Sequence, residues 1–151
     1  MTVEERTAIR REIRVKARPE TIFPLLTDAS RMVRWKGSLA ELEPRAGGIY
    51  RVQFNSRDIV RGTYVEVERP RRVVFTWGWE GSSAVPPGSS TVEITLTPDG
   101  DATIVRLEHR DLPEEARAKH LQGWDLYIPR LAIAAAGGDP GPDPNVEPKE
   151  M

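Results

Sequence analysis

The chain has 151 residues, of which 38% are hydrophobic and 30% are charged, and this is typical of one soluble domain with a single hydrophobic core. Its 22 lysines and arginines oppose 23 aspartates and glutamates, for a net charge of -1, so no excess charge favours nucleic acid or a membrane surface. The sequence has no cysteine and only two histidines, which excludes disulfides, thiolate sites, a cysteine nucleophile and a histidine-rich metal centre.

The N-terminal stretch MTVEERTAIRREI lacks the apolar run of a signal peptide. No segment approaches the roughly 18 consecutive apolar residues of a membrane span, so we expect a cytoplasmic protein without membrane insertion. Within AIRREIRVKA, the apolar residues Ile9, Ile13 and Val15 are separated by charged residues. This pattern predicts a half-buried strand with a basic outer face.

Two short helices are predicted next. Pro19 opens a helical turn in RPETIFPLLTD, and the segment ends near Asp28. Its apolar face consists of Ile22, Phe23, Leu25 and Leu26. The following stretch, ASRMVRWKG, predicts a second short helix that stops at Gly37.

Residues 38 to 110 contain turn residues about every 8 to 12 positions, which is typical of an antiparallel meander. Six strands are predicted, in SLAELEP, GIYRVQFN, DIVRGTYVEVE, VVFTWGWE, TVEITLT and ATIVRLEHR. The stretches PRAGG, RPRR and PDGD mark turns between strands, and the Asp-Gly pair is a strong hairpin signal. With the first strand, the sheet should have seven strands.

The strand VVFTWGWE places Val73, Phe75, Trp77 and Trp79 on one face, because side chains of a strand alternate with period two. Across the whole sheet, the same alternation predicts an apolar inner face and a charged outer face. The predicted inner residues are Tyr50, Val52, Phe54, Val65, Val67, Phe75, Trp77, Trp79, Val92, Ile94, Leu96, Val105, Leu107 and His109. The predicted outer residues are Arg51, Gln53, Glu66, Glu93, Arg106 and Glu108.

Residues 113–136 change to a helical period, and Glu114 and Glu115 suit its first turn. Leu121, Trp124, Ile128 and Leu131 form its apolar stripe. Pro129 is expected to kink or end this helix, because proline removes one hydrogen bond and clashes with the preceding turn.

The last segment, residues 137–151, is rich in glycine, proline and acidic residues and has little apolar surface to bury. We therefore expect one domain over residues 1–136 and a disordered tail over 137–151. Removal of this tail should leave the melting temperature almost unchanged.

The order strand, two helices, six strands and long helix is that of the helix-grip fold. Several stretches resemble the homologues of the activator of heat-shock protein 90 ATPase, within the START-like SRPBCC superfamily. They are RPETIFPLLTDASRMVRWKG, GGIYRV, GTYVEVERPRRVVFTWGWE, STVEITLTPDGDATIVRLEHRDLP and HLQGWDLYIPRL. The resemblance implies an α+β, START-like helix-grip fold of order β-α-α-β6-α, in which a curved seven-stranded antiparallel sheet wraps around a long C-terminal helix.

The resemblance also implies three classes of function, and fold alone does not choose among them. Most stand-alone relatives are similar to small-molecule or lipid-binding proteins. The eukaryotic namesakes are two-domain co-chaperones, and a few superfamily relatives are cyclase-type or aromatase-type enzymes.

A candidate ligand cavity is predicted between the sheet and the last helix, where aromatic residues with one polar atom on an apolar body suit the walls of a binding site. On the helix, His120, Trp124 and Tyr127 share one stripe. The candidate residues are Trp35, Tyr50, Val52, Phe54, Phe75, Trp77, Trp79, His109, His120, Trp124 and Tyr127. The alternative for each of them is ordinary core packing.

The predicted cavity measures roughly 300–1,000 Å³ and admits a mostly apolar, ring-bearing or acyl ligand. His109 or His120, with a tyrosine hydroxyl, would orient this ligand. Gly123 either packs closely against the sheet or contacts the ligand. The loop EGSSAVPPGSS, residues 80–90, is either a lid or a variable surface loop.

A cyclase-type enzyme would need a polar pair deep in the cavity, such as a histidine with a carboxylate. Alternation places Glu108 on the outer face, and Asp125 lies off the helical stripe, so no such pair is visible. No nucleophile motif, phosphate loop or metal-ligand cluster is present. We expect a small apolar ligand, no cofactor, no nucleic-acid partner and a monomer or homodimer, with chaperone binding as the alternative and catalysis last.

Overall fold

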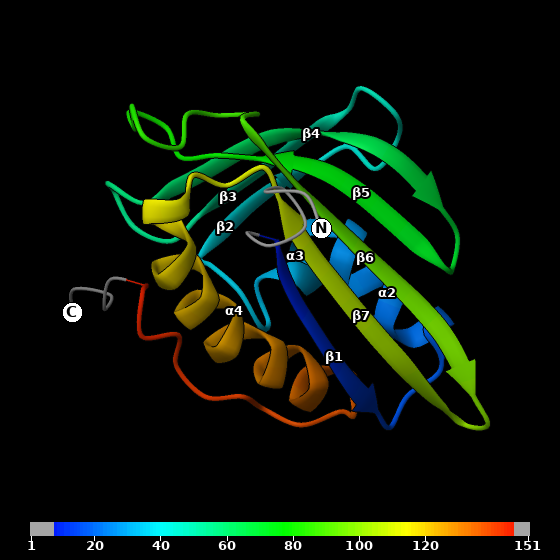
Figure 1. Cartoon of the computed structure of the whole chain (residues 1–151). Coiled ribbons are helices and arrows are strands. Elements are labelled where there is room, and N and C mark those ends of the chain that lie inside the picture. Colours follow the sequence, from blue (N-terminus) through cyan, green and yellow to red (C-terminus); the bar gives the residue numbers. More distant parts are fainter. Residues whose placement is uncertain (1–7, 147–151) are drawn as a thin grey trace.

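The computed structural model describes residues 8–146, and its elements follow the predicted order (Figure 1). The helices are α2 (Pro19–Thr27), α3 (Ala29–Met32) and α4 (Glu114–Ala135). The strands are β1 (Ile9–Val15), β2 (Leu39–Leu42), β3 (Ile49–Gln53), β4 (Ile59–Glu68), β5 (Arg72–Trp77), β6 (Ser90–Asp99) and β7 (Ala102–Arg110). No helix within the described range is long and apolar enough to cross a membrane.

The seven strands form one antiparallel sheet in the order β1-β7-β6-β5-β4-β3-β2. Strands β2 to β7 are a meander, and β1 joins the sheet beside β7, with Ile9 opposite His109 and Val15 opposite Thr103. The sheet curves, and the long helix α4 lies along it (Figure 1). This is the predicted α+β helix-grip fold.

The inner face of the sheet carries the core, largely as alternation predicts. In β6, Val92, Ile94 and Leu96 are buried while the residues between them are partly exposed. The two short helices close the same core, because the hydroxyl of Tyr64 in β4 donates a hydrogen bond to the carbonyl of Leu26 over 3.0 Å. Helices and sheet therefore share one core.

The prediction that Val65 faces inward is wrong. Val65 is 52% exposed, while its neighbour Tyr64 is 1% exposed. The register of β4 against β5 shifts between Tyr64 and Glu66, and a bulge of this kind inserts one residue into the alternation. Tyr64 and Val67 consequently contact the core, and Val65 points outward.

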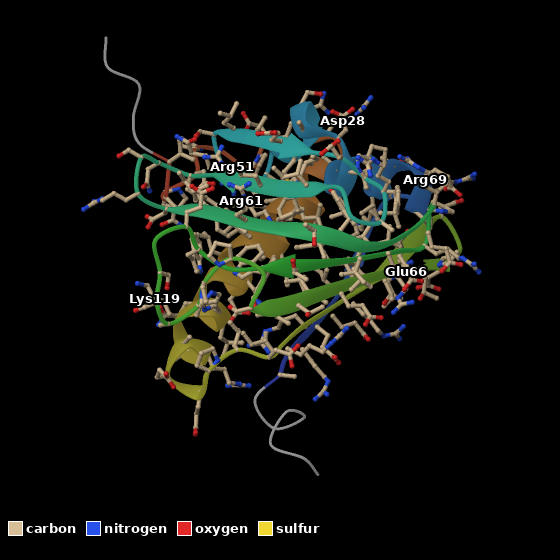
Figure 2. The ribbon with its side chains drawn as sticks, turned by 90° about the horizontal axis from the view of Figure 1, so that it is seen from above. Asp28, Arg51, Arg61, Glu66, Arg69 and Lys119 are labelled. Atoms are coloured by element: carbon tan, nitrogen blue, oxygen red, sulfur yellow. The ribbon has the colours of Figure 1, made fainter. Side chains whose placement is uncertain are left out.

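The outer face carries a row of ion pairs across five strands. The row runs Arg10–Glu108–Arg110–Glu93–Arg72–Glu66, with nitrogen–oxygen distances from 2.9 to 3.3 Å. Figure 2 shows Glu66 toward one end of β4, and Arg51 and Arg61 toward the other end of the sheet. Exposed pairs contribute at most about 1 kcal/mol each, so their main consequence is a polar, charge-balanced face.

The second predicted helix is shorter than expected, because α3 ends at Met32 and turns continue to residue 36. These turns direct Trp35 and Lys36 into the protein, where both side chains are buried. The indole N–H of Trp35 donates to the carbonyl of Leu25 over 2.9 Å. Gly37 follows with a φ of +83°, a conformation that glycine adopts without strain.

Helix α4 continues through Pro129 to Ala135, so Pro129 does not end the helix, and a kink at this residue stays a prediction. Pro129 lies on the exposed side of the helix, and the buried residues Ile128 and Leu131 hold the chain on either side of it. The carbonyl of Asp125, which loses its usual partner, belongs to an exposed residue that water can hydrate.

Residues 137–146, the described part of the predicted tail, contain no helix or strand, and residues 147–151 lie outside the described range. Arg130, which is 8% exposed, donates to the carbonyls of Pro140, Gly141 and Pro142 over 3.0 to 3.2 Å. Its Nε also donates to the carbonyl of Trp35 over 2.9 Å. One buried guanidinium thus binds the segment to α4 and to the turn after α3.

We expect Arg130→Met to lower the free energy of unfolding by about 2 kcal/mol, because the carbonyls that its guanidinium binds lose a charged donor. Urea unfolding with an unchanged slope would measure the loss. The matched control is Arg34→Met at an exposed arginine, for which a change within about 0.5 kcal/mol is expected. Equal stability of the two variants would contradict a structural role for residues 140–142.

Candidate functional site

A cavity of about 700 Å³ lies between the N-terminal half of α4, the end of β5 and the loop that follows β5. Its apolar walls come from Trp77 and Trp79 on one side and from Trp124 and Tyr127 of α4 on the other. Phe54, just after β3, closes another side and packs against Trp79 and Tyr127, with ring centroids 5.9 and 5.5 Å away. The volume is within the usual range of small-molecule sites, roughly 300–1,000 Å³.

The structure divides the predicted site residues into two groups. Six line the cavity, namely Phe54, Trp77, Trp79, His120, Trp124 and Tyr127. The other five, Trp35, Tyr50, Val52, Phe75 and His109, are buried in the core and do not line it. Tyr50 and Phe75, for example, stack on each other with centroids 4.0 Å apart, so these rings fill space behind the cavity wall.

His109 is completely buried, and both of its ring nitrogens are hydrogen-bonded. The indole N–H of Trp124 donates to Nδ1 over 3.0 Å. The hydroxyl of Ser90 donates to the carbonyl of Trp77, so it accepts from Nε2 of His109 over 2.9 Å. This network assigns the neutral tautomer with hydrogen on Nε2, and burial lowers the pKa of His109 well below 6.5.

The hydrogen bonds of His120 assign the opposite tautomer, with hydrogen on Nδ1. The indole N–H of Trp79 donates to Nε2 over 2.9 Å, so Nδ1 carries the hydrogen and donates to the carbonyl of Ala116 over 2.9 Å. Burial lowers the pKa of His120 below 6.5 as well. Neither histidine has a free ring nitrogen, which differs from the predicted role of His109 or His120 in orienting a ligand.

Lys36 also lines the cavity, although the sequence pattern did not predict it there. It is 2% exposed, and its ammonium nitrogen lies between 4.9 and 5.5 Å from the ring centroids of Trp35, Tyr50, Trp77 and Trp124. Its Nζ donates to the hydroxyl of Tyr50 over 2.7 Å. Burial lowers the pKa of Lys36 from 10.5 to about 7, although Asp143 acts in the opposite direction.

The sequence did contain a signal for Lys36. Met32, Trp35 and Lys36 stand at positions i, i+3 and i+4, which place all three on one face of a helical turn. The first two are apolar, so a lysine on that face is expected to be drawn inward with them. A buried lysine with a lowered pKa in a cavity is a typical feature of functional sites.

The loop between β5 and β6 forms one wall of the cavity through Ser82 and Val85. Trp79 donates its backbone N–H to the carbonyl of Val85 over 2.8 Å. At Gly78, a Cβ atom would lie 1.8 Å from the carbonyl oxygen of Pro86, so only glycine allows this close approach. Glu80 is held to the sheet by Arg51 over 2.9 Å.

The rim of the cavity is charged. Arg57 and Asp58 contribute from the turn after β3, and Glu115 and Lys119 contribute from α4. Figure 2 shows Lys119 projecting from α4 near the loop that follows β5. The described residues contain no group of three or more histidine, aspartate or glutamate side chains that could hold a metal ion.

Residues 16–136 match the family model described as Activator of Hsp90 ATPase homolog 1-like protein. The chain is 43% identical to an AHSA1-like protein from Rhizobium etli, with a TM-score of 0.73 over 95% of this chain and 91% of that one. It is 29% identical to CalU16 from Micromonospora echinospora, with a TM-score of 0.73 over 89% of this chain and 77% of that one. No curated protein matches the sequence.

A third structure shows the same fold at low identity. The Aha1 dimer from Colwellia psychrerythraea is 18% identical, with a TM-score of 0.75 over 85% of this chain and 95% of that one. At this level of identity, the likeness concerns the arrangement of helices and strands alone.

Proposed function

We propose that this chain, which belongs to the family of Activator of Hsp90 ATPase homolog 1-like proteins, binds a small, mostly apolar ligand in the cavity between α4 and β5. The observation that carries the proposal is the cavity of about 700 Å³ with three tryptophans in its walls, Trp77, Trp79 and Trp124. Flat aromatic walls with few free polar groups favour an apolar ligand over a polar one.

The indoles of this wall are held in place before any ligand binds. Trp124 is hydrogen-bonded to His109 and Trp79 to His120, and the ring of Trp77 packs against those of both tryptophans with centroids 5.3 and 5.7 Å away. A wall that is already ordered loses little conformational entropy on binding. The arrangement therefore supports a preformed site.

Gly123 offers a direct test, because it lines the cavity and a Cβ atom there would meet nothing within 4 Å. Its position in the middle of α4 costs helix stability. We expect Gly123→Ala to raise the free energy of unfolding by about 0.5–1 kcal/mol and to leave ligand binding nearly unchanged. A large side chain at the same position, as in Gly123→Phe, should occupy the cavity and weaken binding at least about tenfold.

The measurement uses the neutral dye N-phenyl-1-naphthylamine, whose emission rises in apolar sites and whose absorption quenches tryptophan. The wild type and Gly123→Ala should bind it saturably, while Gly123→Phe should retain the melting temperature and lose the dye. Absence of saturable binding to the wild type would overturn the proposal. Equal binding by Gly123→Phe would place the dye elsewhere.

Co-chaperone-like binding is the second candidate, and the family match is the observation that favours it. The Colwellia structure is that of an Aha1 dimer. The co-chaperone-like function therefore includes the possibility that this chain acts as a dimer. Stimulation of the slow ATPase of a purified Hsp90 tests it directly. No stimulation at a large excess of this protein would dismiss it.

A further inference from the structure

We propose that the ligand carries a carboxylate, and that the ammonium of Lys36 and the indole N–H of Trp77 bind its oxygens in the cavity. This inference rests on the proposed function, because it assigns the chemical class of the ligand in the same cavity. It extends that function from apolar ligands in general to apolar acids.

Lys36 supplies the first reason. Its Nζ has one hydrogen bond among the described residues, to the hydroxyl of Tyr50, while an ammonium carries three donors. No carboxylate lies within ion-pair distance of it in residues 8–146. The charge of Asp143 acts on the ammonium only from beyond that distance. A buried ammonium without a directly paired anion is costly, and an anionic ligand group provides that partner.

Trp77 supplies a second, independent reason. Trp77 is 4% exposed, and its Nε1 is buried without a hydrogen-bond partner in the part of the chain that the structure describes. A buried indole N–H usually finds an acceptor. Both side chains line the cavity, and Nζ of Lys36 lies 5.0 Å from the centroid of the Trp77 ring, so two neighbouring residues carry donors that are not fully used.

The neighbouring polar groups already have partners. The ring nitrogens of both histidines are hydrogen-bonded, and the hydroxyl of Tyr127 donates to Asp143 over 2.7 Å and accepts from Asn145 over 3.0 Å. The carboxylate of Asp143 also accepts the N–H of Gly37 over 2.9 Å. Among the described residues, the buried cavity groups with unused hydrogen-bonding capacity at Lys36 and Trp77 are donors, which favours a ligand with acceptor oxygens.

A carboxylate fits this donor set best. It accepts through two oxygens, so one group can bind both a lysine and an indole N–H. The single negative charge of a carboxylate matches the single positive charge of the ammonium. A phosphate near neutral pH carries up to about two negative charges, so one negative charge would remain unpaired between aromatic rings. The remaining walls suit an aromatic ring or an acyl chain.

The experiment compares acids with their neutral amides of nearly equal shape. The two pairs are 2-naphthoate with 2-naphthamide and dodecanoate with dodecanamide, which separate aromatic from acyl tails. Each compound competes with N-phenyl-1-naphthylamine at pH 7. In the wild type, we expect at least one acid to bind about tenfold or more tightly than its amide, since charge-assisted hydrogen bonds are the stronger ones.

Two variants assign the preference to the proposed groups. In Lys36→Met, the affinity of the acid should fall to within about threefold of that of the amide. Trp77→Phe removes the indole N–H and keeps an aromatic wall, so the acid preference should fall about threefold. An unchanged circular-dichroism spectrum shows that each variant still folds, and the readout is the ratio of acid to amide affinity within that variant.

The outcomes separate this inference from the proposed function. If the dye binds but acids and amides bind equally, the carboxylate assignment is overturned and the apolar site stands. If the acid preference persists in Lys36→Met, Lys36 is not the recognition group. If neither the dye nor any of the four compounds binds the wild type, both proposals fail.

Discussion

Replacing Trp124 by alanine is expected to lower the free energy of unfolding by about 4 kcal/mol, since truncation of a buried aromatic residue costs about 3–5 kcal/mol. Trp124 is 3% exposed and packs against Trp77 and His109, with ring centroids 5.3 and 6.0 Å away. Its removal also leaves Nδ1 of His109 without a donor in the core. Trp124 therefore stabilises the domain as well as lining the cavity.

The matched variant is Trp124→Phe, which keeps an aromatic ring and removes the indole N–H. We expect it to cost about 1–2 kcal/mol, mainly because buried Nδ1 of His109 loses its hydrogen bond. Urea unfolding followed by circular dichroism measures both variants. A cost for Trp124→Ala no greater than that for Trp124→Phe would contradict the packing role of the indole.

Most of the fold could be predicted from the sequence, because period-two alternation, turn residues and helical stripes are local signals. The seven strands, the two short helices and α4 all follow from them. The bulge in β4 could not be predicted in this way, since it adds one residue without changing the apolar pattern. Val65 therefore faces solvent instead of the core, and Tyr64 is buried.

Long-range contacts determine the structure of α4 around Pro129 and of the segment that follows α4. Two expectations, that Pro129 kinks or ends the helix and that residues 137–151 form a disordered tail, were based on local propensity and apolar surface. The structure instead holds the helix through buried neighbours and holds residues 140–142 through Arg130. Local patterns do not display the tertiary contacts that continue the helix past Pro129 and bind residues 140–142.

The sequence pattern selects several of the aromatic residues that line the cavity, but it does not show which hydrogen bonds the histidines and tryptophans form. Alternation selected Trp77 and Trp79, and the helical stripe selected Trp124 and Tyr127, all of which line the cavity. The pairing of each histidine with an indole depends on contacts between distant segments. The position of Lys36 beside buried residues predicts burial, but a lysine side chain is almost always exposed. Lys36 was therefore not included among the predicted cavity residues.

The second large effect is expected for Lys36→Met, which should stabilise the protein. Burial lowers the pKa of Lys36 from 10.5 to about 7, and a fall of this size corresponds to a cost of roughly 5 kcal/mol for the charged form. Attraction to the surrounding rings offsets part of this cost, and the variant leaves the hydroxyl of Tyr50 without its partner. We expect a net gain of about 2–3 kcal/mol at pH 7.

The gain should depend on pH with a defined sign. The folded state binds the lysine proton more weakly than the unfolded state, so the cost of Lys36 is fully present below pH 7 and disappears as the pH rises toward 10.5. Two neighbouring groups are coupled to this titration. Asp143 raises the pKa of Lys36, and the charge of Lys36 lowers the pKa of His109. The wild type and Lys36→Met should therefore converge in stability at high pH.

Urea unfolding of both proteins at pH 7 and pH 10 measures this convergence, and Lys36→Gln serves as a polar control of similar length. A destabilised Lys36→Met at pH 7 would show that the ammonium contributes more to the fold through the rings than it costs through burial. A stabilised variant that loses its preference for acids would identify Lys36 as a residue kept for ligand recognition at the expense of stability.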